Sequence, residues 1–318
     1  MTSAWTAKEI PSQQGRRVLI TGANSGIGLE AALELARRGA EIILPARTEA
    51  KADAAIARIR AQIPSAKLIP EILDLADLRS VHSFASRVVE MYPGRSLDLL
   101  INNAGVMAIP TRELTPDGFE RQFATNYLGP FALTALLFWS IKPQPGSRIV
   151  TVASGVTNHA KLDFDNLQSQ RRYSPMFQAY AQSKLADLIF QQELQRRLTA
   201  IGSPILSTGA HPGYAVTNLQ VTGPGDNMPL LLRLGIAILK PLASQDAAHG
   251  ALPTLFAATA PQAQPGGYYG PSGFQELKGH PVPAKITAAA KDSALAQRLW
   301  AESERLTGVT FGALSETA

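Results

Sequence analysis

Short aliphatic runs alternate with segments of helical periodicity along the first half of the chain. The aliphatic runs predict strands at 18–20, 41–44, 67–72, 97–101 and 148–152. Between them, apolar residues at three- and four-residue spacing predict helices at 27–38, 49–62, 80–91 and 118–139. This alternation is typical of repeated βα units, and it therefore predicts a parallel sheet.

The second half of the chain continues the pattern less regularly. A helix is predicted at 177–200, followed by strand candidates at 204–207 and 268–269. The predicted fold class is α/β, with one doubly wound parallel sheet of about seven strands, helices on both faces and a C-terminal helical extension. We expect residues 1–16 to be an N-terminal extension and residues 17–318 to form a single domain.

Composition narrows the class of protein. Hydrophobic residues make up 45% of the 318 positions and charged residues 17%, which is enough apolar material for a packed core. The absence of cysteine excludes disulfides and thiolate chemistry. The net charge of +5 is scattered in pairs such as Arg37-Arg38, with no basic and aromatic stripe, so we expect no nucleic-acid partner. No metal site is predicted.

The sequence contains no segment expected to cross a membrane. Residues 1–16 lack an apolar run and a cleavage site, so they do not resemble a secretory signal, and a cytoplasmic location is expected. The longest apolar stretch, 229–239, is interrupted by Arg233 and is far shorter than the roughly 20 residues of a spanning helix.

A glycine-rich turn separates the first predicted strand from the first predicted helix. Glycines let backbone N–H groups and the positive helix end approach a pyrophosphate. Any turn favours glycine, so it is the placement between strand and helix that indicates a nucleotide site. The predicted contacts are Gly22, Asn24, Ser25, Gly26, Ile27 and Gly28.

Arg47 follows the second predicted strand, where an acid would be expected if the site bound the ribose 2′-hydroxyl of NAD. Its guanidinium offers a fork of donors to a 2′-phosphate, which favours NADP (NADPH) over NAD. The alternative is a solvated loop arginine. Pro45 lacks a ladder donor, so we also expect this strand to fray there.

Small and polar residues follow the fourth predicted strand, where open α/β sheets bind ligands. These are Asn103, Ala104 and Gly105, and an ordinary turn is the alternative interpretation. Asn126 lies within a predicted helix, an unfavourable place for asparagine unless its amide has a partner.

Ser154 follows the fifth strand, and Tyr180 lies one helical turn before Lys184 on the next long helix. Of the seven tyrosines, only Tyr180 has a lysine four positions later. Because about one such pair is expected by chance, its meaning depends on the surrounding motifs.

In motif content and order, the chain resembles the short-chain dehydrogenase/reductase family over about residues 17–269. The resemblance rests on the glycine turn, Asn102-Asn103-Ala104-Gly105, Asn126, Ser154 with Tyr180 and Lys184, and His211-Pro212-Gly213. It is greatest for the branch of retinol dehydrogenases, WW-domain oxidoreductases and protochlorophyllide reductases, because of residues 103–107, 180–185 and the long C-terminal part. The resemblance implies a single-domain Rossmann fold and interconversion of a carbonyl and an alcohol with a nicotinamide cofactor.

The resemblance also implies the roles of individual residues. Tyr180 would be the proton donor, and Lys184 would stabilise its phenolate and bind the ribose hydroxyls. Ser154 would hydrogen-bond the substrate oxygen, and Asn126 would hold a water that links Lys184 to solvent.

The remaining implied contacts are to the cofactor. Asp74 and Leu75 would lie at the adenine, and Pro212, Gly213 and Thr217 near the nicotinamide and phosphates. Asp74 could instead cap the helix that begins near Asp77, and His211 is more consistent with a structural role. Ala153 and Gly129-Pro130 depart from the common pattern of relatives, which weakens any transfer of substrate identity.

Two other functions remain open at this stage. A non-enzymatic NADP sensor on the same fold would typically lose the tyrosine or the lysine, and both are present. A carbon–carbon double-bond reductase of the protochlorophyllide type would generally use cysteine, which is absent.

Residues 214–242 are expected to cover the substrate. The segment is apolar on nearly every face, so it predicts a lipophilic carbonyl or alcohol, such as a retinoid, steroid, polyketide or long-chain ketone. Core packing, a dimer contact or peripheral membrane contact are the alternatives. A homo-oligomer through the helices that carry Asn126 and Tyr180 is a further possibility.

Overall fold

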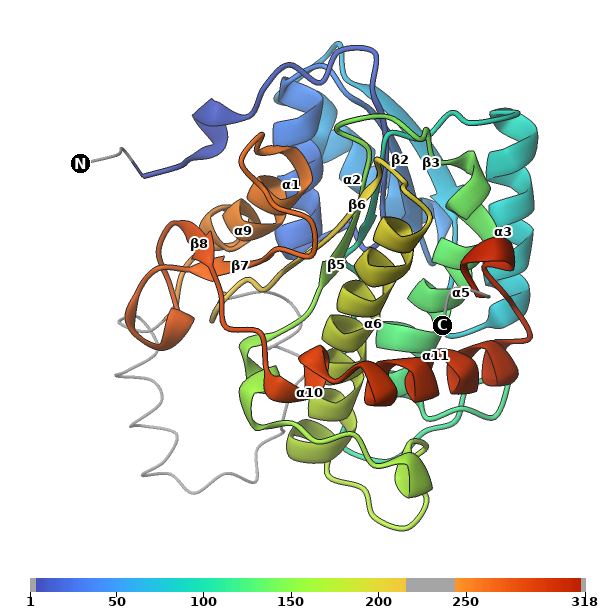
Figure 1. Ribbon diagram of the computed structural model, residues 1–318. Coiled ribbons are helices and arrows are strands. Elements are labelled where there is room, and N and C mark those ends of the chain that lie inside the picture. Colours follow the sequence, from blue (N-terminus) through green and yellow to red (C-terminus); the bar gives the residue numbers. More distant parts are fainter. Residues whose placement is uncertain (1–3, 216–243, 316–318) are drawn as a thin grey trace.

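The computed structural model describes residues 4–215 and 244–315. In these residues, one sheet of eight strands runs through the molecule in the order β3-β2-β1-β4-β5-β6-β7-β8 (Figure 1). Thr217 and most of the predicted substrate segment lie outside the described residues. The strands are β1 (Arg17–Ile20), β2 (Glu41–Ala46), β3 (Lys67–Ile72), β4 (Leu99–Asn102), β5 (Arg148–Val152), β6 (Leu206–Ala210), β7 (Tyr268–Pro271) and β8 (Pro281–Pro283).

All neighbouring strands pair in parallel except β7 and β8. The strand order reverses between β1 and β4, which places the ligand-binding edge of a doubly wound sheet at their carboxyl ends. The expectation of about seven strands missed β8. Two of its three residues are prolines, which are confined to edge strands, so its sequence carries no strand signal.

Helices cover both faces of the sheet (Figure 1). One core joins the sheet to α1, α2 and α9, and a second core joins it to α3, α5, α6 and α11. The longer helices are α1 (Gly26–Arg37), α2 (Glu49–Arg60), α3 (Leu78–Met91), α5 (Gly129–Leu137), α6 (Ala181–Ala200), α9 (Ala247–Thr259) and α11 (Ser293–Thr307), and α4 (Arg121–Phe123) and α10 (Ala288–Lys291) are short.

Side-chain caps set where several helices begin. Thr48, Asp77, Asp246 and Asp292 each accept a hydrogen bond from a backbone N–H in the first turn of α2, α3, α9 and α11. Gly308 ends α11 with a φ of +69°, a left-handed conformation that favours glycine.

Two predicted helices include π-helical segments, whose turns are wider than those of an α-helix. The helix expected at 118–139 consists of α4, the π-helical segment η2 (Ala124–Leu128), α5 and a 3-10 turn, η3 (Phe138–Ser140). The helix expected at 177–200 begins earlier, with the π-helical segment η6 (Pro175–Tyr180) before α6. Asn126 and Tyr180 both lie in these π-helical segments, a backbone feature that is frequent at functional sites.

The expectation that β2 frays at Pro45 is wrong. β2 continues to Ala46, and Pro45 pairs in register with Glu71 of β3. Pairing with β1 on the other side ends at Ile43, so the ladder with β1 does not reach Pro45. The strand expected at 204–207 begins two residues later, at Leu206.

The described part of the N-terminal extension packs against the domain. Trp5 is buried with its ring edge-on to Phe256 of α9, at a centroid distance of 5.3 Å. Arg38 donates hydrogen bonds to the carbonyls of Ala7 and Lys8 at 2.9 and 2.7 Å. These contacts hold the segment over the end of α1.

The C-terminal segment crosses the outer side of α5 and α6 (Figure 1). Trp300 of α11 and Phe311 pack their rings against Phe131 of α5 and Phe190 of α6. Buried Arg197 of α6 donates to the carbonyl oxygens of Leu314 and Ser315 at 2.6 and 3.1 Å. The predicted C-terminal extension is therefore a layer of the fold that covers α5, which continues from the segment with Asn126, and α6, which carries Lys184.

No helix among the described residues is long and apolar enough to span a membrane.

Candidate functional site

The carboxyl ends of β1 and β4 are tied together at the glycine turn. Thr21 Oγ1 accepts hydrogen bonds from the backbone N–H groups of Asn103 and Ala104, each at 3.1 Å. The Asn103 side chain donates in return to the carbonyl of Thr21 at 3.0 Å. Thr21 was not among the predicted site residues, although its position directly before the glycine turn could have indicated this role.

The glycines of this turn stand where no side chain fits. Gly22 has a φ of +69°, and a Cβ there would lie 2.8 Å from the Ala104 Cα. At Gly28 a Cβ would lie 2.5 Å from the Gly22 carbonyl oxygen. Ser25, the N-cap residue of α1, makes no side-chain capping bond. The first turn of α1 thus offers backbone donors beside a narrow glycine cradle, which fits the phosphates of a dinucleotide. Asn24 and Ile27 are half-buried in the same turn.

The residue predicted to bind the 2′-phosphate follows β2, and the residues predicted to lie at the adenine follow β3. Arg47 is exposed immediately after β2. Asp74 accepts a hydrogen bond from the Ala76 N–H at 2.9 Å, whereas Asp77 caps α3. Asp74 is therefore not the cap of that helix. The Leu75 carbonyl lies where a side chain on Gly129 would be, 2.3 Å from that Cβ position, so α5 begins against this loop.

The Asn126 amide is held by the loop after β4 and by α6. Its Oδ1 accepts from the Val106 N–H at 2.7 Å, and its Nδ2 donates to the Val106 carbonyl at 3.0 Å and to Ser183 Oγ at 2.8 Å. Both amide protons are used, which leaves one acceptor position on Oδ1. The Asn126 amide thus has the hydrogen-bond partners that are expected for an asparagine within a helix.

Lys184 and Asn126 meet beside Gly105. A Cβ on Gly105 would lie 3.2 Å from Asn126 Oδ1 and 3.5 Å from Lys184 Nζ. Lys184 Nζ donates to the carbonyl of Val152, the last residue of β5, at 2.8 Å. Ser154 follows two residues later and accepts from the Val156 N–H at 3.4 Å. The chain thus brings the lysine to the end of the strand that leads to Ser154.

Tyr180 lies at the junction of η6 and α6, and 9% of its surface is exposed. Its backbone carbonyl accepts from Ser183 Oγ at 2.8 Å, so Ser183 connects the tyrosine backbone to the Asn126 amide. This connection was not predicted from the sequence.

Asp187 is a second charged group that the sequence-based predictions omitted. Its Oδ2 accepts a hydrogen bond from Lys184 Nζ at 2.8 Å, and both side chains are buried. Burial raises the pKa of Asp187 to about 7, against the attraction of Lys184. Burial also acts to lower the pKa of Lys184, but Asp187 and Tyr180 outweigh it and raise that pKa. A carboxylate three residues after a lysine on a helix is a spacing that could have revealed the pair.

The turn after β6 is fixed by His211. Its Nδ1 accepts from the Gly213 N–H at 3.3 Å, so its proton lies on Nε2, which bonds Glu276 at 2.9 Å. Gly213 has a φ of +63°. Both ring nitrogens are occupied, which is consistent with the structural role expected for His211. Glu276 lies 65 positions away in the chain and has no sequence signal that links it to this turn.

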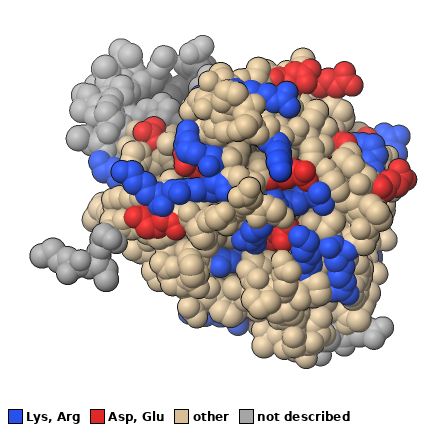
Figure 2. All heavy atoms as spheres, turned by 90° about the horizontal axis from the view of Figure 1, so that it is seen from above, with Lys and Arg blue, Asp and Glu red and all other residues tan. Residues whose placement is uncertain are grey.

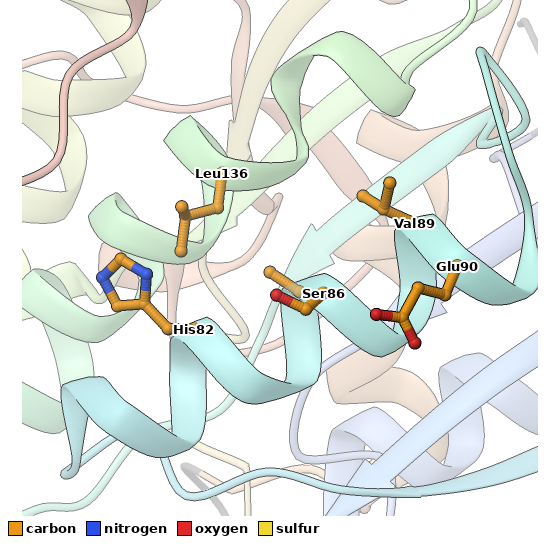
Figure 3. Close-up of a pocket in the computed structure, with 6 residues that line it drawn as sticks. His82, Ser86, Val89, Glu90 and Leu136 are labelled. Carbon is orange, nitrogen blue, oxygen red and sulfur yellow. The ribbon is translucent and has the colours of Figure 1, made fainter.

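The hollow in Figure 3 lies apart from these residues. His82, Ser86, Val89 and Glu90 of α3 face Leu136 of α5 there, and none is a predicted site residue.

Lys and Arg side chains are interspersed with Asp and Glu on the face in Figure 2. No group of three or more His, Asp or Glu side chains within 4–215 and 244–315 could hold a metal ion.

Comparison with known proteins gives the family. Residues 16–224 match the family model of the short chain dehydrogenases. The chain is 40% identical to human retinol dehydrogenase 13 over 304 residues, covering 95% of this chain and 87% of that protein. It is 38% identical to mouse polyprenol dehydrogenase over 309 residues, covering 95% and 87%.

Solved structures agree with the sequence relatives. A protein of Mycobacterium paratuberculosis described as putative and uncharacterized superposes with a TM-score of 0.78 at 40% identity, covering 97% of this chain and 99% of that one. A short chain dehydrogenase from Burkholderia cenocepacia in complex with NADP superposes with a TM-score of 0.59 at 25% identity, covering 79% and 93%. The chain therefore belongs to the short-chain dehydrogenase family, in its retinol dehydrogenase-like branch, and is an oxidoreductase that acts on alcohol and carbonyl groups.

Proposed function

We propose that this enzyme interconverts a lipophilic alcohol and its carbonyl compound with NADP(H), with Tyr180 as the proton donor and acceptor. The observation that carries the proposal is the arrangement of Tyr180 and Lys184 one turn apart. The Lys184 ammonium is anchored to the carbonyl of Val152, at the end of the strand that leads to Ser154.

When bound, the nicotinamide cofactor supplies or accepts the hydride. The chain's own residues handle the proton and the developing charge. Tyr180 gives its phenolic proton to the carbonyl oxygen during reduction, and the Lys184 charge stabilises the phenolate that remains. Ser154 donates a hydrogen bond to the same oxygen as its charge develops.

The Asn126 amide supports a proton path to solvent. Asn126 Oδ1 keeps one acceptor position, and Oδ1 and Lys184 Nζ lie 3.2 and 3.5 Å from the Cβ position that Gly105 leaves empty. A water held there accepts a proton from, or returns one to, Lys184. This use of the side chain explains why a helix retains an asparagine at a buried position.

Arg47 supports the preference for NADP over NAD. Its exposed guanidinium follows β2, where it is free to reach a 2′-phosphate, and the Asp74 and Leu75 loop lies after the neighbouring strand. The NADP complex of the Burkholderia relative is consistent with this choice.

Two observations support a lipophilic substrate. The relatives named above include a retinol and a polyprenol dehydrogenase. Phe177 of η6 and Phe274 of the 3-10 turn η7 (Phe274–Glu276) are 84% and 82% exposed. Phe177 lies three residues before Tyr180 in η6, and Phe274 lies two residues before Glu276, the partner of His211, so both exposed rings are on segments that adjoin proposed site residues in the chain.

A panel of ketones, aldehydes and alcohols tests the proposal, with cofactor absorbance as the readout. The wild-type protein should turn over lipophilic members with NADPH or NADP. Tyr180→Phe should bind NADPH with unchanged affinity but lose about 10²–10⁴-fold in turnover, because it removes the proton donor and keeps the ring. Tyr92→Phe, remote from the site, is the control. A loss of less than about tenfold in Tyr180→Phe would falsify the assignment.

A further inference from the structure

Lys184 makes a second strong contact besides the one to the strand. Its ammonium donates to Val152 O and to Asp187 Oδ2, both at 2.8 Å. An ammonium has three donors, so two are used by these fixed acceptors and one is left for the site. The two acceptors therefore determine where the third proton of Lys184 points.

The Lys184–Asp187 pair is enclosed. The two side chains are 6% and 3% exposed, so bulk solvent contributes little to stabilising the charge of the ammonium. An ammonium buried without a counter-ion tends to lose its proton, because burial penalises the charged form. A neutral Lys184 would not stabilise the Tyr180 phenolate.

Among the titratable groups around Lys184, Asp187 has the largest effect on its pKa. On α6 and η6 these groups are Lys184, Asp187 and Tyr180. Tyr127 of η2 and Tyr268 of β7 lie within electrostatic reach of Asp187, and burial raises the pKa of each well above its usual value. Both tyrosines are therefore neutral throughout the working range of the enzyme.

We propose that Asp187 is a positioning residue for the proton transfer. Its carboxylate orients the Lys184 ammonium and keeps it protonated, and thereby sets the pH at which Tyr180 gives up its proton. The inference rests on the proposed function of Tyr180 and Lys184. It assigns to Asp187 no contact with substrate or cofactor.

The test is the pH dependence of kcat/KM for alcohol oxidation with NADP, which should rise as Tyr180 loses its proton. Asp187→Asn keeps a hydrogen-bond acceptor of the same size and removes the charge. We expect the apparent pKa of the profile to move upward by about 1–3 units, because Lys184 loses its proton and no longer favours the phenolate. Asp187→Glu should return the profile toward the wild-type position.

Asp98 provides a matched control. It is also a buried carboxylate that accepts from a lysine, Lys142, at 2.8 Å, but it precedes β4 at the opposite end of the strand from Asn103. Asp98→Asn should lower the thermal midpoint and leave the pH profile unchanged. A purely structural role for Asp187 would give the same pattern.

Each outcome decides the inference. An upward shift of the apparent pKa with Asp187→Asn supports it. An unchanged profile overturns it. A downward shift also overturns it, because it would show that the carboxylate counteracts the effect of Lys184 on Tyr180. If Asp187→Asn does not fold, Asp187→Ser carries the comparison. If neither Asp187→Asn nor Asp187→Ser folds while Asp98→Asn does, Asp187 has a structural role and the inference is also overturned. A wild-type protein without Tyr180-dependent activity would instead refute the proposed function itself.

Discussion

Asn126 donates a hydrogen bond of 2.8 Å to Ser183, and this contact joins the π-helical segment η2 to the first turn of α6. Ser183 in turn donates to the carbonyl of Tyr180. The amide that is proposed to hold a water and the backbone of the proposed acid are thus connected through one hydroxyl. Their relative position is set by hydrogen bonds within the protein.

The space beside Asn126 gives the first prediction. Gly105→Ala would place a methyl group 3.2 Å from Asn126 Oδ1 and 3.5 Å from Lys184 Nζ, in the position proposed for the relay water. We expect kcat to fall by about tenfold or more, within the range of general acid–base contributions. Single-turnover rates and NADPH titration separate this effect from cofactor binding. Unchanged kcat would exclude a relay at this position.

Arg47 gives the second prediction. NADPH should have a higher kcat/KM than NADH, and Arg47→Glu should reduce NADPH use by about 1.5–3 kcal/mol for the lost charge-assisted contact, with added repulsion. Arg60→Glu, at the far end of α2, is the charge-matched control. Equal or better kinetics of the wild-type protein with NADH would contradict the preference.

The third prediction concerns substrate character. Across a series of alkyl ketones of increasing length, each buried methylene should improve binding by up to about 0.8 kcal/mol until the pocket is full. The kcat/KM values of the series provide the measurement. A flat series, or higher activity on small polar carbonyls, would be inconsistent with a lipophilic substrate.

Trp300 gives a prediction for stability. It is buried against Phe131, Phe190 and Phe311, and the guanidinium of Arg197 lies 4.2 Å from its ring centre. Trp300→Ala should lower the free energy of unfolding by about 3–5 kcal/mol, because it leaves a large cavity. Denaturant titration measures this. Trp139→Ala, at a site that is 51% exposed, should cost clearly less.

Glu276 gives a prediction for acid stability. The hydrogen bond from His211 holds the pKa of Glu276 below its usual value of 4.5. A lowered folded-state pKa contributes stability above pH 4.5, and that contribution is lost as the pH falls through the folded value. Glu276→Gln should therefore be less stable than wild type at pH 7, and the difference should narrow toward pH 3. Glu90→Gln, at an exposed position, is the control, and its stability should stay close to that of the wild type at every pH.

Periodicity predicted most of the fold because its signals are local. β3 and β5 have the predicted bounds, since aliphatic residues mark both segments. β8 was missed because Pro281 and Pro283 have no ladder donors, and the edge position that tolerates them depends on the completed sheet. The π-helical turns at Asn126 and Tyr180 were missed because they arise from a shift in backbone hydrogen bonding that apolar spacing does not record.

The residues of the candidate site likewise fall into those with a local sequence signal and those that only the fold brings together. Tyr180 and Lys184 could be singled out because their four-residue spacing on a helix is a local relationship and the surrounding motifs follow the order of a known family. Asp187 was equally accessible and was overlooked. The bond between His211 and Glu276 spans the chain segment that leads from β6 to η7, so only the fold brings these two residues together.

The layer formed by α10, α11 and η8 (Gly312–Leu314) also bears on how the protein matures. Trp300 and Phe311 are synthesised after every aromatic residue that they cover on α5 and α6. Until they emerge, the nascent chain exposes this apolar surface on the helix that carries Lys184, a condition that favours aggregation or chaperone binding. We therefore expect α6 to reach its final packing only after Trp300 and Phe311 have been synthesised.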